Sequence, residues 1–68
     1  MNGPAQMLKR PGARIRVILL SDNTYVPVIS VPRYYPTLDR VYNTVCYTGA
    51  CELSQHAAEK QIEAWRAS

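Results

Sequence analysis

The stretch RIRVILLSDNTYVPVISV, residues 14–31, contains the pattern that decides the fold. In its first part Ile15, Val17 and Leu19 alternate with basic or other apolar side chains, which is the period of two expected of a strand with one buried face. The run SDNT that follows carries side chains that cap turns and tolerate left-handed backbone. Because β-branched residues resume directly after this run, the stretch predicts a β-hairpin.

Pro27 lies inside the second of these two strands. Proline has no amide hydrogen to donate to a ladder, so it is expected in an edge strand or at a bulge. We therefore expect the second strand to lie at the edge of the sheet, with only one good pairing side. The first strand would then lie in the middle, and the predicted strand order is second, first, third.

A third strand is predicted over residues 40–48, RVYNTVCYT. Neither of its faces is strongly polar, which favours a sheet with a helix on one side and a partly apolar, tyrosine-bearing surface on the other. Residues 32–39, PRYYPTLD, connect this strand to the hairpin and form the longest predicted loop.

The chain contains one sustained helical pattern, ELSQHAAEKQIEAWRA, residues 52–67. Ser54 is placed to be its N-cap, because a serine hydroxyl accepts from a free amide of the first turn. Ala58, Ile62 and Trp65 recur at helical spacing and predict a helix that lies across one sheet face, with Trp65 as its largest anchor.

The predicted fold class is therefore α+β: a three-stranded, mostly antiparallel sheet with one C-terminal helix packed on one face. A chain of 68 residues makes one small domain, expected here over residues 14–68, with a thin core and no deep cleft. Residues 1–13, MNGPAQMLKRPGA, show no sustained periodicity, and a flexible basic N-terminal segment is expected there.

The formal net charge of +3 is unevenly spread, because most of the basic side chains precede residue 41. These are Lys9, Arg10, Arg14, Arg16, Arg33 and Arg40. Such asymmetry favours an acidic protein surface or a nucleic acid as partner. Ordinary solubilising charge is the alternative interpretation.

Catalytic and metal-binding patterns are weak. Cys46, Cys51 and His56 are spaced C-x4-C-x4-H, but tetrahedral zinc needs four ligands and a fourth is not evident. The sequence has no glycine-rich phosphate loop and no carboxylate pair in a plausible cleft. We therefore expect no enzyme activity, no metal and no cofactor, and Cys46 is interpreted as a small core residue.

No secretory signal pattern is visible, and no segment approaches the length needed to span a bilayer. The sequence therefore predicts a cytoplasmic protein without a membrane partner.

The loop SVPRYYPTLDR, residues 30–40, is the predicted binding site. Binding energy at protein interfaces concentrates in tyrosine, tryptophan and arginine side chains, and flanking prolines reduce the freedom that a loop loses on docking. The predicted partner-binding residues are Arg33, Tyr34, Tyr35 and Arg40, with Arg14 and Arg16 as electrostatic support. In the alternative interpretation, one of the two tyrosines covers the open end of the core.

The expected function is non-catalytic binding of a protein, as an inhibitor or adaptor of a larger host complex. The small size and the lack of a catalytic set are typical of the accessory proteins of phages and mobile elements. Direct nucleic-acid binding by a basic, tyrosine-bearing sheet face is the second hypothesis. A homodimer is a third possibility, since three strands and one helix would leave a sheet edge uncovered.

Overall fold

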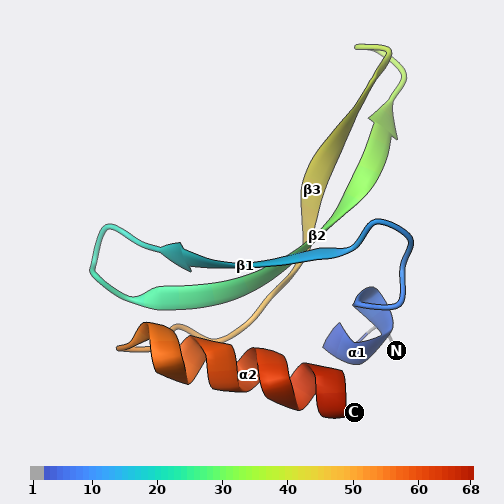
Figure 1. Cartoon of the computed structure of the whole chain (residues 1–68). Helices are drawn as coiled ribbons and strands as arrows, with labels where there is room; N and C mark the ends of the chain where they lie inside the picture. The colour runs from blue at the N-terminus through green and yellow to red at the C-terminus, as the bar shows by residue number, and fades with distance from the viewer. Residues whose placement is uncertain (1–2) are drawn as a thin grey trace.

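The computed structural model describes residues 3–68. Its elements, in chain order, are α1 (Pro4–Met7), β1 (Arg14–Leu19), β2 (Tyr25–Tyr35), β3 (Arg40–Thr48) and α2 (Gln55–Ala67). The strands form one antiparallel sheet, and α2 lies across one face of its β1–β2 part (Figure 1). The predicted α+β class, the three antiparallel strands and the C-terminal helix are confirmed.

A tight turn joins β1 to β2, as the SDNT run predicts. Asn23 adopts the left-handed conformation with φ 64°, and the Leu20 amide donates to the Thr24 carbonyl at 2.8 Å. The hydroxyl and then the amide of Thr24 donate to the carboxylate of Asp22, and these bonds hold the pKa of Asp22 below its ordinary value. The turn is thus fixed by its own side chains.

The predicted strand order is wrong: β2 is the central strand, and the order is β1-β2-β3. The Pro27 carbonyl accepts from the Gly49 amide at 2.8 Å, so the proline nitrogen faces the β3 side too. On that side β3 ends at Thr48, and pairing resumes only where Glu52 bridges Tyr25. The missing amide hydrogen of Pro27 therefore falls in a gap of the ladder, which is why a central strand tolerates it.

The predicted loop is also largely wrong, because β2 continues to Tyr35 and only residues 36–39 connect it to β3. The register shifts where Ile29 pairs with Tyr47 but Ser30 pairs with Val45, which leaves Cys46 as the extra residue of a β-bulge. Beyond the bulge, the β2–β3 ribbon bends away from the body and projects from it (Figure 1). We call this projecting part, residues 31–45, the distal hairpin.

The core lies between α2 and the sheet. Ala58 and Ile62 are the buried residues of the helix, and Ile29 of the central strand has no exposed surface. Trp65 is half-buried, and its ring meets that of Tyr47 edge to face, with 5.3 Å between the centroids. Trp65 therefore anchors the helix at the base of β3, while Ile62 lies deeper.

A side-chain amide joins the strand end to the helix. The Gln61 side chain accepts from the Ala50 amide at 3.1 Å and donates to the Ala50 carbonyl at 2.9 Å. Ser54, the predicted N-cap, accepts from the Ala57 amide at 3.1 Å and starts the helix. These bonds fix where the chain leaves the sheet and at which residue α2 begins.

The N-terminal segment packs against the domain over its described part; residues 1–2 lie outside the described residues. Pro4 starts the short helix α1, and Met7 is buried at 7 % exposure. Gly12 has φ 74° and lies against the ring of Pro32, at the base of the distal hairpin. The lack of periodicity in this segment reflects its short elements, and its mobility stays a prediction.

Candidate binding site on the distal hairpin

Apart from the contact of Gly12 with Pro32 at its base, the distal hairpin projects from the body, and within residues 3–68 no helix lies along either of its faces (Figure 1). Its tip is a four-residue turn, in which the Leu38 amide donates to the Tyr35 carbonyl at 3.1 Å and Asp39 takes a positive φ of 50°. A two-stranded ribbon without a covering layer is only marginally stable in water. Its own side chains must therefore hold it.

One face of the distal hairpin is aromatic and basic. The rings of Tyr35 and Tyr42 meet edge to face with centroids 5.9 Å apart, and the Tyr35 hydroxyl hydrogen-bonds the Thr44 hydroxyl at 2.8 Å. The guanidinium of Arg33 lies 5.5 Å from the centre of the Tyr35 ring. Arg40 is the cross-strand partner of Tyr35 and completes this face. Tyr35 therefore holds its face together.

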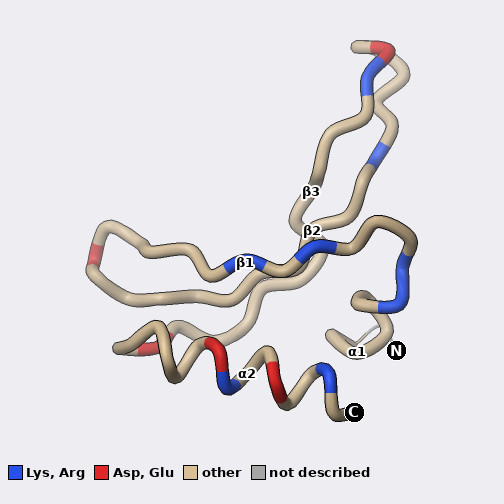
Figure 2. Tube along the Cα trace, in the orientation of Figure 1, with Lys and Arg blue, Asp and Glu red and all other residues tan. Residues whose placement is uncertain are grey.

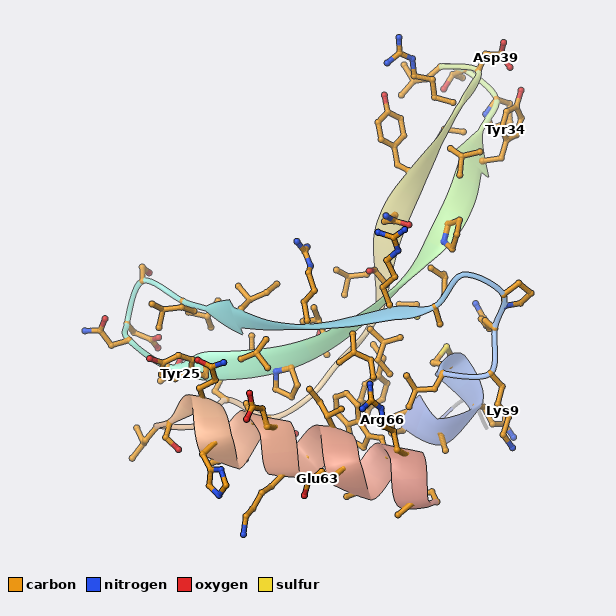
Figure 3. The ribbon with its side chains drawn as sticks, viewed as in Figure 1. Lys9, Tyr25, Tyr34, Asp39, Glu63 and Arg66 are labelled. Carbon is orange, nitrogen blue, oxygen red and sulfur yellow. The ribbon has the colours of Figure 1, made fainter. Side chains whose placement is uncertain are left out.

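The opposite face carries Tyr34, paired with Val41, and Pro32, paired with Asn43. The Tyr34 hydroxyl donates to Oδ1 of Asp39 at 2.7 Å, and both side chains lie at the tip of the hairpin (Figure 3). This bond first, and desolvation second, raise the pKa of Tyr34 above its ordinary value. The bond fixes the direction of the Tyr34 ring, which is still 54 % exposed.

Exposed apolar side chains concentrate on the distal hairpin. Among residues 3–68, five of the eight large hydrophobic side chains that are exposed lie there: Tyr34, Leu38, Val41, Tyr42 and Val45. Basic positions lie on both of its strands, and an acidic position lies at its tip (Figure 2). Clustered apolar surface with a charged surround is typical of an interaction site.

The predicted site residues divide between the hairpin and the body. Arg33, Tyr35 and Arg40 share one face of the distal hairpin, and Tyr34 lies on the other face. Arg14 and Arg16, the other two predicted residues, lie in β1 of the body and are exposed. The four loop residues thus lie on the same hairpin but on two different faces of it, and Arg14 and Arg16 lie outside the hairpin.

Neither tyrosine covers the core, so the alternative interpretation of the tyrosine pair is wrong. Tyr35 is the half-buried ring, but it packs within the hairpin, and Tyr34 is the exposed ring. Sequence reasoning missed Leu38, Val41 and Val45 as surface residues. The alternation of the third strand could have indicated the two valines, had residues 32–35 been predicted as its partner strand.

The cysteine and histidine pattern does not form a cluster. Cys46 is half-buried at the bulge and Cys51 is exposed, and both thiols are free. In the part of the chain that the structure describes, no group of three or more metal-ligating side chains comes together.

Comparison of the chain with protein-family models, with curated proteins and with solved structures gave no match. No helix over residues 3–68 has the length and apolar character that crossing a membrane requires. The molecule is a small α+β domain with a projecting hairpin.

Proposed function

We propose that this protein is a non-catalytic binding protein that engages a protein partner through the distal hairpin. It would act in the cytoplasm as an inhibitor or adaptor of a larger complex. The observation that carries the proposal is the concentration of exposed apolar side chains on an element that contributes nothing to the core. In the free protein those apolar side chains are exposed to water. A partner that buries them gains about 25 cal/mol of binding free energy for each Å² of apolar surface removed from water.

Two tyrosine side chains of the hairpin are already held by hydrogen bonds, which favours binding. Tyr34 is held by Asp39, and Tyr35 is held by Thr44. Ordering a free side chain on binding costs roughly 0.5–1.5 kcal/mol, so rings that are already fixed lose less. Pro32 and Pro36 limit the backbone in the same way, since each fixes its own φ.

The test is capture of partners from a lysate of the native source, followed by mass spectrometry and by binding measurements with the purified partner. Tyr34→Ala and Val41→Ser should each lose the partner, because they remove neighbouring apolar side chains from one face. Leu53→Ser is the matched control, since Leu53 is 89 % exposed but lies outside the hairpin. Equal binding by all three variants would place the interface elsewhere.

Nucleic acid is the second candidate partner, and the other face of the hairpin favours it. Arg33 and Arg40 flank the Tyr35 and Tyr42 rings there, which combines phosphate-binding and stacking groups on a ribbon narrow enough to enter a groove. In that case binding to an oligonucleotide should fall steeply with salt, and Arg33→Gln should flatten the slope. Absence of binding at low salt would exclude this candidate.

A further inference from the structure

Within residues 3–68 no strand pairs with the outer edge of β1, so this edge presents unpaired backbone groups. Tyr25 exchanges both of its backbone hydrogen bonds with Glu52, at 2.8 and 2.7 Å, so its N–H and C=O point away from β1. Leu19 of β1 is paired with Tyr25, and in such a non-hydrogen-bonded pair both residues point their N–H and C=O outward, so those of Leu19 point away from β2. The same holds for Val17, which is paired with Pro27. With Ile15 two residues earlier, the edge offers three outward-facing residues spaced evenly about Val17.

An open groove of about 400 Å³ lies beside this edge, between β1 and α2. Its apolar lining comes from Ile15 and Val17 of the strand and from Ile62 of the helix. Its polar lining on the helix runs from Gln55 and Glu59 near the start of α2 to Arg66 near the end, with Glu63 between. Arg16 of β1 also lines the groove. Along the helix, the groove thus carries the acidic Glu59 and Glu63 first and the basic Arg66 at the far end.

We propose that two copies of this chain form a symmetric dimer in which the β1 strands pair antiparallel about Val17 and the two grooves meet. The sheet would then continue through both subunits, and the unpaired groups of the edge would be satisfied. A strand with free backbone groups next to an apolar groove is the arrangement that strand addition requires.

The charges along the groove fit a second copy. In a dimer with antiparallel β1 strands the two α2 helices also run antiparallel on the same side of the sheet, so the acidic end of each groove meets the basic end of the other. Glu59 of one subunit then faces Arg66 of the second subunit, and the reverse contact is equivalent by symmetry. Arg66 extends from α2 toward the sheet, on the side that faces the groove (Figure 3).

The register about Val17 also avoids a conflict between like charges. A dyad on Arg16 would place two guanidinium groups directly opposite each other, which is destabilising. With the dyad on Val17, Arg16 lies opposite Ile18 of the second subunit, and Ile15 lies opposite Leu19. The exposed Leu19 side chain gains an apolar neighbour in this register.

The dimer would carry two distal hairpins, because the hairpin and the β1 edge are different parts of the sheet. Two hairpins on one particle allow bivalent binding to a partner with repeated sites. The dimer goes beyond the proposed function and does not depend on it, since the β1 edge can pair whether or not the hairpin binds a protein.

Sedimentation equilibrium of the full chain from micromolar to millimolar concentration tests the dimer. The wild type should change from monomer to dimer over this range. Glu59→Arg alone and Arg66→Glu alone each turn both symmetric contacts from attractive to repulsive and should raise the dissociation constant about tenfold. An equimolar mixture of these two variants should dimerise like the wild type, because the mixed dimer restores both contacts.

Val17→Pro is the backbone variant. It removes an outward-facing N–H without removing a β1–β2 hydrogen bond, so the fold should persist while dimerisation weakens at least about tenfold. Lys60→Glu, on a helix position that does not line the groove, is the matched control and should leave the dissociation constant unchanged. A wild type that stays monomeric to millimolar concentration, or a variant mixture no tighter than its components, would overturn the proposal.

Discussion

Gly49 lies against the indole of Trp65: a Cβ built on Gly49 would be 2.9 Å from Cζ2 of that ring. The same Cβ would be 2.8 Å from Cγ of Pro27 and 2.6 Å from Oε1 of Gln61. The residue that follows β3 thus lies where the central strand, the helix anchor and the Gln61 amide meet. The helix approaches the sheet this closely because position 49 has no side chain.

Gly49→Ala should therefore destabilise the domain by about 1–3 kcal/mol, the usual range for overpacking a filled site. In a domain of this size that corresponds to a fall in Tm of roughly 4–8 °C for each kcal/mol. Thermal unfolding followed by circular dichroism measures it. Gly3→Ala is the matched control, since no atom of the other described residues lies within 4 Å of a Cβ there. Similar melting temperatures for both variants would contradict the close packing.

Gln61→Ala removes the two hydrogen bonds to Ala50 and the one donated to the Glu52 carboxylate, and it should lower the free energy of unfolding by about 1–2 kcal/mol. Gln55→Ala loses only an exposed hydrogen bond to Glu59 within the helix. It should change the free energy of unfolding by about 0.2–0.5 kcal/mol, as is usual for a surface pair on a helix. Urea denaturation distinguishes the two variants. If Gln55→Ala were the more damaging, the Gln61 amide would not be what joins strand to helix.

Local patterns were sufficient to predict β1, β3, the first part of β2 and α2, but not α1, the full length of β2 or the strand order. The alternation about Val17 and the helical spacing of Ala58 and Ile62 are properties of short windows, and the structure follows both. The central position of β2 depends on a gap in its pairing with residues 48–52, which lie more than 20 residues further along the chain. A short window of sequence around Pro27 cannot show this gap. Pro27 correctly indicated that its strand lacks a backbone donor on one side. That side faces a short gap in the pairing with the chain after β3, and not solvent.

The candidate site was predictable in composition but not in geometry. Tyr34 and Arg33 could be selected because their residue types recur at interfaces. Their placement on opposite faces follows from the continuation of β2 through PRYY, which two prolines made look like a loop. The prolines are tolerated because Pro32 lies beyond the part of β2 that β1 pairs with, and Pro36 begins the turn.

The phenol of Tyr34 should titrate above the ordinary tyrosine pKa near 10. The hydrogen bond to Asp39 favours the protonated phenol, so its stabilising effect is present below the ordinary pKa and is lost as the pH rises through the raised value. Ultraviolet difference titration of the wild type against Tyr34→Phe isolates this group. Asp39→Asn should bring the pKa of Tyr34 back toward 10, and an unchanged titration in that variant would exclude the bond as the cause.

The distal hairpin should be the least protected part of the sheet. No other element among residues 3–68 covers it, so local opening breaks few contacts beyond the Tyr35 cluster. Native-state hydrogen exchange should show faster exchange for residues 31–45 than for Val28 and Ile29 in the body. Equal protection throughout would mean that the hairpin and the body unfold as one unit.

The two adjacent tyrosines should separate stability from binding. Tyr35→Ala removes the ring that contacts Tyr42, Thr44 and Arg33, and it should increase amide exchange throughout residues 31–45 while the melting temperature of the body hardly changes. Tyr34→Ala removes one exposed ring and its bond to Asp39, and it should leave hairpin protection within about twofold of the wild type, because a single exposed hydrogen bond contributes little. If both variants lose the partner but only Tyr35→Ala loosens the hairpin, Tyr34 contacts the partner directly, and Tyr35 acts by holding the surface in shape. If Tyr34→Ala loosens the hairpin to the same extent, its loss of binding reports on folding, and Val41→Ser becomes the variant that decides whether this face makes the contact.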